Sequence, residues 1–490
     1  MIASLILVPA LAGLAAFLIR SDRLRRVMLV AVAAIHATLS LATWCRAPAV
    51  VRGAWLGEDA AGRLILTLTS LLFLACAVYA VAYLRDERGK RHSDFEEGFI
   101  FSNAREAVFT GCLLLFLAAM TLVALSRHLA LVWVAIEATT LASAPLIYFH
   151  RHHRSLEATW KYLLICSVGI ALALLGVLFF AVSAIRPGGG AVSLDIGDLL
   201  AAAPNLSVPW LKAAFVLLLV GYGAKMGLAP FHTWLPDAHS EAPSVASALL
   251  SGALLNCAFL GILRAHQVCV AAGLAHFSER LLLGFGLLSM AVAAAFIVGQ
   301  GDYKRMLAYS SVEHMGILAV GVGLGGLGAF AAMLHVINHS LTKAMLFMVA
   351  GNLLAVYRTK ATREVSGAVR ALPVSGVLWI LGLLAIVGSP PFGPFVSEFL
   401  IAKAALDSGR AAIAIVYLLL LAIVVTGIAG PALSMAQGRS TASPDAASRQ
   451  NPIFSAVPAI FAAAVLMMGV YLPPVIGRSL HETARLFGRG

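Results

Sequence analysis

Long apolar runs recur along the whole chain and restrict its fold more than any other feature of the sequence. Windows of about 20 apolar residues, the length of helix that crosses a bilayer, predict about fourteen membrane-spanning helices. The predicted spans are residues 2–19, 27–45, 64–84, 107–126, 128–149, 158–185, 210–229, 242–263, 281–300, 306–324, 327–356, 374–402, 411–435 and 453–472. A water-soluble core could not bury all of them in 490 residues, of which 61% are hydrophobic and 12% charged. The sequence therefore predicts an all-α, multi-pass membrane protein.

The basic residues indicate how the predicted helices are oriented. The net charge is +12, and Lys and Arg are more frequent in the loops that follow odd-numbered spans, such as 85–105 and 358–370. By the positive-inside rule these loops should be cytoplasmic, with both termini on the periplasmic side. The first span lacks a basic leader and is interpreted as a retained helix. No basic run interleaved with aromatic residues suggests a nucleic-acid partner.

The six cysteines give no sign of a redox or metal centre. None forms a CxxC pair, no CxxCH haem motif occurs, and no GxGxxG follows a predicted strand. We therefore expect neither a cofactor nor a catalytic residue in this chain, and electrons would be handled by other chains.

A charged residue and a proline interrupt the seventh span. Lys225 lies in the stretch 221–236, five residues before Pro230. A charge in a membrane helix costs about 2.5–3.5 kcal/mol, and the carbonyls freed by a proline are tolerated only where they are buried or line a cavity. A second break, GSPPFGP at 388–394, interrupts the twelfth span and precedes Glu398. Two broken helices at corresponding places are typical of inverted-repeat transporters, with two unrelated kinks as the alternative.

Glu137 lies in the middle of the fifth span, with no basic residue within one turn. Lys225, on another helix, is the best candidate for its partner. A carboxylate near a buried lysine favours the protonated lysine, so a pair that opens and closes would switch the proton affinity of Lys225. The alternative is a static ion pair that holds two helices together.

Titratable residues recur along one face of the eleventh span. His335, His339 and Lys343 follow at intervals of four residues and therefore share a helix face. Such a strip in a membrane suits a proton relay. His314 adds a titratable group in the tenth span, whereas Glu313 beside it is expected to point to a different face. The alternatives are a polar contact between helices and a metal pair, although no third ligand is evident and we expect no metal.

Three further residues are secondary candidates. Lys161 has Glu157 one turn before it, so an ordinary ion pair is the alternative interpretation. His232 lies in the linker after the first break, which would be either a proton entry vestibule or a solvated loop. Lys403 follows the second break.

Together these residues resemble the antiporter-like proton-channel subunits shared by respiratory complex I, multisubunit Na+/H+ antiporters and membrane-bound group 4 hydrogenases. The resemblance covers about residues 60–435. It rests on the segments WVAIE (133–137), KMGLAPFHTWLPDA (225–238), DYKRMLAYSSVEHMG (302–316), HVINHSLTKAMLF (335–347) and PFGPFVSEF (391–399). Within the family, the chain looks most like the F-type membrane subunit of hydrogenase-4 and formate hydrogenlyase complexes.

The resemblance implies a fourteen-helix subunit with two inverted five-helix repeats and broken helices 7 and 12. The implied divisions are 1–106 for helices 1–3, 107–264 for the first repeat, 265–435 for the second, and 436–490 for helix 14 and the tail. The family's path runs from the glutamate and lysine of helices 5 and 7, through helices 8, 10 and 11, to helix 12. Two positions depart from the family pattern. Asn256 stands where many relatives carry lysine, and Glu398 stands where several relatives carry lysine and some carry glutamate.

The resemblance also implies a function. The chain would move protons or Na+ across a bacterial inner membrane as a non-catalytic subunit of a redox-driven complex of the hydrogenase or formate hydrogenlyase type. Its partners would be the lipid membrane, other membrane-arm subunits and soluble nickel–iron and iron–sulfur subunits. The alternatives are a subunit of a cation/proton antiporter without a redox partner, and the membrane subunit of an inorganic-carbon uptake system.

Overall fold

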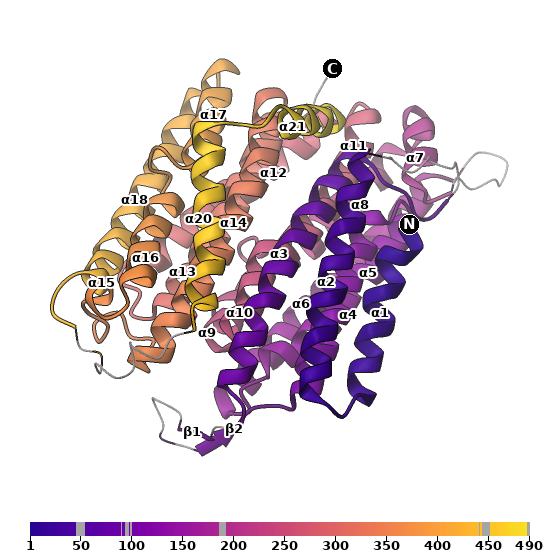
Figure 1. Ribbon diagram of the computed structural model, residues 1–490. Helices are drawn as coiled ribbons and strands as arrows, with labels where there is room; N and C mark the ends of the chain where they lie inside the picture. Colours follow the sequence, from indigo (N-terminus) through magenta and orange to yellow (C-terminus); the bar gives the residue numbers. More distant parts are fainter. Residues whose placement is uncertain are drawn as a thin grey trace.

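The computed structural model describes residues 1–45, 54–89, 91–93, 98, 100–185, 193–440, 442 and 451–487. Its helices run roughly side by side between two ends of the molecule (Figure 1). They are α1 (Ile2–Leu18), α2 (Asp22–Cys45), α3 (Ala60–Asp86), α4 (Glu106–Leu125), α5 (Leu129–Ile147), α6 (His153–Ser183), α7 (Ile196–Ala202), η1 (Ala203–Asn205), α8 (Val208–Met226), α9 (Trp234–Glu241), α10 (Ser244–Leu249), η2 (Leu250–Leu254), α11 (Leu255–Ala271), α12 (Ala275–Ile297), α13 (Tyr303–Leu324), α14 (Gly326–Tyr357), α15 (Ala368–Ala371), α16 (Pro373–Ile386), α17 (Gly393–Asp407), α18 (Ala411–Ala436), α20 (Ile453–Val470) and α21 (Pro474–Phe487).

The helical, multi-pass fold predicted from the apolar runs is confirmed. Helices prevail because a backbone in lipid must satisfy its hydrogen bonds within its own segment. Among the described residues, 12 helices are long and apolar enough to cross a membrane, and α1 and α16 are shorter apolar helices. Each predicted span overlaps one helix or a run of consecutive helical segments, and the span 242–263 overlaps three of them, α10, η2 and α11. The count of fourteen, the inverted repeats and the domain divisions stay predictions.

One short antiparallel pair of strands departs from the helical pattern. β1 (Arg91–Ser93) pairs with β2 (Ile100–Ser102), with Arg91 opposite Ser102. The pair lies between α3 and α4 at the lower end of the molecule in Figure 1, and the amphipathic helix α21 lies across the opposite end. These two elements therefore mark the two ends of the helix bundle.

Both helix breaks lie where the sequence predicts them. The helix α8 ends at Met226, and Gly227 follows with φ 85°, a left-handed conformation that favours glycine. Helix resumes at Trp234 in α9. In the second break α16 ends at Ile386, Gly388 has φ 64°, and α17 begins at Gly393 with a proline in its first turn.

The centre of the molecule is formed by α11, α13 and α14. Every residue from 244 to 266 is buried, and α13 is almost entirely buried. The outer helices carry exposed apolar side chains instead, such as Leu141 on α5 and Val168 on α6. Polar residues on the central helices therefore face protein and not lipid.

Candidate functional site

Lys225 lies near the end of α8, next to the first break, and its side chain is fully buried. Its Nζ donates a hydrogen bond to Thr140 Oγ1 at 2.9 Å and another to Tyr162 OH at 2.5 Å. The Nζ atom also lies 4.5 Å from the centroid of the Tyr162 ring. Hydroxyl oxygens and an aromatic face thus replace the water that would otherwise solvate this charge.

Glu137 is connected to Lys225 through a single hydroxyl group. Thr140 accepts from Lys225 and donates to Glu137 Oε2 at 3.1 Å, and Ser167 donates to Glu137 Oε1 at 3.2 Å. Among the described residues, no ion pair within 4.0 Å joins Glu137 to Lys225. The structure therefore brings Glu137 and Lys225 together through a bridging hydroxyl and not as a direct ion pair, and their role in transport stays a prediction. A hydroxyl that accepts on one side and donates on the other can pass a proton without a direct contact.

Asn256 connects the first half of the site to the central helix α14. It follows the π-helical segment η2, a distortion that is frequent at functional sites. Its Nδ2 donates to Gly252 O at 2.9 Å and to Ser340 Oγ at 2.8 Å. Within the described chain, its Oδ1 has no hydrogen-bond partner, and no hydrogen bond joins Asn256 to Lys225. An ordered water molecule would be needed to continue the path here.

The structure places the predicted histidine strip of α14 next to His314, which lies in the tenth predicted span. His314 Nδ1 and His335 Nε2 are 2.7 Å apart, and His335 Nδ1 lies 2.9 Å from Ser397 Oγ. The ring of His339 lies 5.1 Å from that of His314, measured between centroids. Lys343 Nζ donates to Leu307 O at 2.7 Å and to the Ser310 hydroxyl. These buried groups form a strip of titratable side chains between α13 and α14.

His314, His335 and Glu398 are the described residues nearest to a metal-binding arrangement, because their ligand atoms lie within 4.8 Å of one another. The separation of 2.7 Å between the two ring nitrogens is a hydrogen-bond distance. Two nitrogens bound to a tetrahedral zinc at about 2.0–2.1 Å would lie roughly 3.3 Å apart. The observed geometry suits a shared proton better than a shared metal, and the absence of a metal stays a prediction.

Glu398, on α17 just after the second break, faces the same region. Its side chain is buried, and Oε1 has no partner among the described residues. A Cβ atom placed on Gly388 would lie 2.0 Å from Glu398 Oε2. Glycine at the break therefore leaves room for this carboxylate, and the positive φ of Gly388 also favours glycine.

Glu313 corrects one expectation from the sequence. It was expected to point to a different face from the relay, yet it is 2% exposed, and its charge interacts with that of Lys343. Ser310, which binds Lys343, lies three residues earlier and therefore on the same side of α13. Because α13 is buried almost all round, neighbouring residues can both face the protein interior. In the sequence, the three-residue spacing between Ser310 and Glu313 is the signal that could have indicated that Glu313 faces Lys343.

Two of the secondary candidates lie away from this buried path. Lys161 is half-exposed and pairs with Glu157 at 2.6 Å and Asp237 at 3.0 Å. Lys403 is half-exposed and pairs with Asp407 at 2.5 Å, one turn further on. His232, in contrast, is buried within the first break, and its ring centroid lies 6.1 Å from that of Tyr309.

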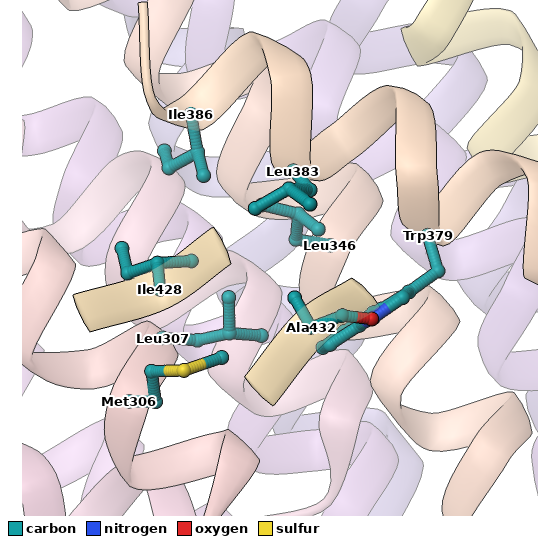
Figure 2. A pocket seen from close by; sticks show the side chains of 8 residues that line it. All are labelled: Met306, Leu307, Leu346, Trp379, Leu383, Ile386, Ile428 and Ala432. Atoms are coloured by element: carbon teal, nitrogen blue, oxygen red, sulfur yellow. The ribbon is translucent and has the colours of Figure 1, made fainter. Parts of the chain in front are cut away.

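A dry apolar patch closes one side of the central helices. Figure 2 shows Leu307, Leu346 and Trp379 around a cavity of about 10 Å³, lined only by apolar residues and a tryptophan. Such a cavity is barely large enough for one water molecule and offers no polar partners. This pocket therefore gives water no polar partners beside α13 and α14.

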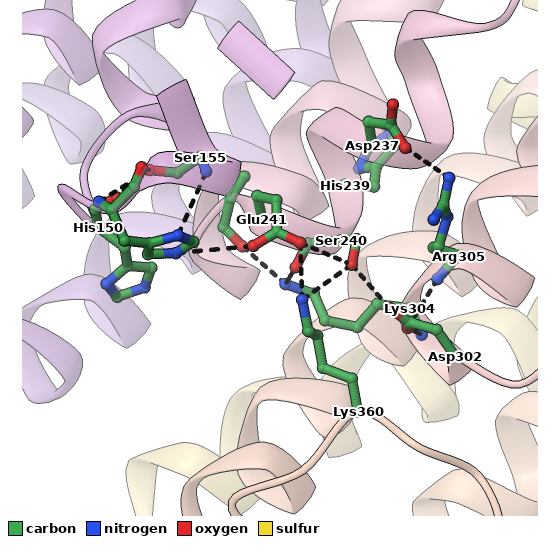
Figure 3. Close-up of polar contacts among 12 residues, drawn as sticks. His150, Ser155, Asp237, His239, Ser240, Glu241, Asp302, Lys304, Arg305 and Lys360 are labelled. Atoms are coloured by element: carbon green, nitrogen blue, oxygen red, sulfur yellow. Dashed lines mark hydrogen bonds and ion pairs between the residues drawn. The ribbon is translucent and has the colours of Figure 1, made fainter. Parts of the chain in front are cut away.

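Ion pairs connect the linker after the first break to the second half of the chain (Figure 3). Lys360 Nζ lies 2.7 Å from Glu241 Oε1, and Arg305 lies 2.5 Å from Asp237. The buried Lys304 donates to Ser240 O at 2.9 Å and to Ala242 O at 2.7 Å. The linker is thus held firmly against α13.

Glu241 remains ionised in this cluster. Burial raises the pKa of Glu241, but the charges of Lys360, Lys304 and Arg154 and the hydrogen bond from Lys360 lower it by more, to below the usual 4.5. A lowered pKa in the folded state stabilises the protein above the unfolded pKa, and the effect is lost as pH falls through the folded value.

We expect Glu241→Gln to lower the stability of the purified protein at pH 7 by about 1–3 kcal/mol, because a charge-assisted hydrogen bond is lost. The difference from wild type should disappear as the pH falls through the folded pKa, below 4.5. Thermal unfolding in detergent over a pH series measures both. Glu157→Gln, which removes an exposed pair, serves as the control. Equal stability of Glu241→Gln and wild type at pH 7 would contradict the role of the cluster.

Comparison with known proteins places the chain in a family. Residues 126–426 match the family model for the transmembrane region of NADH:quinone oxidoreductase and Mrp antiporter subunits, and the chain belongs to this family. It is 36% identical over 428 residues to the hydrogenase-4 component F homolog of Methylacidiphilum infernorum (isolate V4), covering 86% of each chain.

Two other proteins extend the comparison. Hydrogenase-4 component B of Escherichia coli (strain K12) is 30% identical over 380 residues, which cover 74% of this chain and 53% of that protein. This chain therefore spans about half the length of component B. A chain of the Mrp complex from Dietzia sp. DQ12-45-1b has the same fold, with a TM-score of 0.83 and 21% identity over 99% of this chain and 97% of that one.

Proposed function

We propose that this chain translocates protons as a membrane subunit of a redox-driven energy-converting complex. The observation that carries the proposal is the series of buried titratable groups on the central helices, in which His314 and His335 are 2.7 Å apart. Charged and titratable side chains are rare inside membrane proteins and mark ion pathways. A hydrogen-bonded pair of imidazoles passes protons more readily than it would pass a hydrated Na+ ion.

The proposed path has two parts. In the first, a proton at Lys225 exchanges with Glu137 through Thr140. In the second, it follows Lys343, His339 and the histidine pair towards Glu398. Asn256 lies between the parts, where it orders water without carrying a charge.

The family suggests which complex this is. Relatives named as hydrogenase-4 components support a hydrogenase or formate hydrogenlyase type of assembly. Its partners would be other membrane-arm subunits and soluble nickel–iron and iron–sulfur subunits. The location would be a bacterial inner membrane, with the basic loops facing the cytoplasm and both termini facing the periplasm.

Purification of the native assembly through a tag on this chain tests the function. Mass spectrometry identifies the subunits, and redox-driven acidification of proteoliposomes, with and without a protonophore, measures transport. We expect nickel–iron or iron–sulfur subunits and protonophore-sensitive acidification. Small membrane subunits alone would instead favour a cation/proton antiporter, and a zinc protein an inorganic-carbon uptake system.

In this mechanism, the charge of Glu137 should determine how often Lys225 carries a proton. We expect transport to decrease in the order wild type, Glu137→Asp, then Glu137→Gln or Glu137→Ala. The aspartate keeps the charge but withdraws it by one methylene, whereas glutamine removes about 1–4 kcal/mol of electrostatic stabilisation of the ammonium group. Initial acidification rates over a pH series measure the effect. Wild-type transport by Glu137→Gln across that range would reduce Glu137 to a packing residue.

A further inference from the structure

Three buried oxygen atoms near the end of the histidine strip have no hydrogen-bond partner among the described residues. They are Glu313 Oε2 on α13, Glu398 Oε1 on α17 and the hydroxyl of Tyr417 on α18. The three side chains are 2%, 6% and 1% exposed. A buried polar atom without a partner costs about 1–3 kcal/mol, so three of them together require an explanation.

The packing of the helices places these three groups together. Ile317 lies one turn after Glu313, and Ile401 lies three residues after Glu398, so each shares a helix face with its carboxylate. Both isoleucines pack in one apolar cluster with Tyr417. The two carboxyl groups interact electrostatically with each other, and each also interacts electrostatically with the hydroxyl group of Tyr417.

Two carboxylates that interact with each other beside an apolar cluster cannot both be ionised at low cost. One proton held between them removes the repulsion, and a tyrosine hydroxyl can then donate a hydrogen bond to the remaining carboxylate oxygen. A charged Lys343 offsets the remaining negative charge, because it interacts with Glu313. The number of protons held here would therefore depend on the state of Lys343.

We propose that Glu313, Glu398 and Tyr417 form a proton-loading site where the histidine strip ends, an inference that rests on the proposed function. A proton leaves the imidazolium of His314 or His335 and forms an O–H bond with a carboxylate of the site. The imidazole becomes neutral, the carboxylate becomes a carboxylic acid, and no electrons are transferred. Ligand atoms of Glu398 and the two histidines lie within 4.8 Å of one another, so one small side-chain movement or one water molecule suffices for the step.

Site-directed variants of the intact complex test this proposal. We expect Glu313→Gln and Glu398→Gln each to lower the transport rate at least about 10-fold, and Tyr417→Phe to lower it a few-fold. Two variants serve as matched controls. Glu279→Gln removes a buried glutamate that lies 3.8 Å from both His276 and Arg410, and Tyr222→Phe removes a buried hydroxyl without a partner. Both controls should transport at nearly the wild-type rate.

Infrared difference spectroscopy gives a readout that a purely structural role would not change. The wild-type complex should show the C=O stretch of a protonated carboxylic acid, and either glutamine substitution should remove or shift this band. Wild-type transport by Glu313→Gln, while Lys225→Met is inactive, would overturn the proton-loading site and leave the proposed function intact. Binding of radioactive Na+ that disappears in Glu313→Gln, without a carboxylic acid band, would also overturn it.

Discussion

Replacement of Lys225 by methionine should abolish proton translocation while the chain remains folded and assembled. Methionine has a similar volume, and the exchange removes the cost of burying an ammonium group that has no direct ion pair among the described residues. The residues that Lys225 contacts keep other partners, because Thr140 donates to Glu137 and Tyr162 is bonded to Ser143. What is lost is the cation next to the first break, which Thr140 links to Glu137.

Acidification of proteoliposomes that contain the complex measures the effect. We expect the rate to fall by at least about 100-fold, towards the leak of the lipid alone. Lys403→Met is the matched control, since it removes a half-exposed lysine whose partner lies one turn away. Normal pumping by the Lys225→Met complex would contradict the proposed path from its first step. Lys225→Ala should behave as the methionine variant does, although it also leaves a cavity.

The fold was largely predictable because its determinants are local. Apolar runs fix the helices, and Gly227 with Pro230, like Gly388 with the prolines that follow it, fixes the breaks. The histidine strip was predictable for the same reason, since four-residue spacing places side chains on one face of a single helix. In each case the signal lies within a few residues of the feature.

Contacts between helices were not predictable in this way. The bridge of Thr140 between Glu137 and Lys225 depends on how α5 and α8 both pack against α6, and the burial of Glu313 depends on the helices that surround α13. For Lys161 and Lys403, the local sequence suggests burial, but the structure shows exposure. Each lies within an apolar window of the sequence, yet a long side chain can reach an acidic partner one turn away and remain half-exposed.

The second large effect should follow removal of the histidines of α14. We expect the double change His335→Ala, His339→Ala to impair translocation more than either single change. The reason lies in the geometry. His335 is hydrogen-bonded to His314 and Ser397, while the ring of His339 lies beside that of His314 with no partner of its own among the described residues. A single substitution therefore leaves His314 next to one remaining imidazole, and water can fill the gap. Two substitutions leave it isolated.

Transport rates of the single and double variants test this, with metal analysis of the purified protein as the second readout. We expect no stoichiometric zinc, nickel or iron in wild type. His36→Ala is a control for loss of a buried histidine, because His36 binds Thr121 and Ser70 away from the strip. Its transport should stay near the wild-type rate. A metal present in wild type and absent from the double variant would replace the relay with a metal site. Full transport by the double variant would show that protons pass from Lys343 to the carboxylates without these imidazoles.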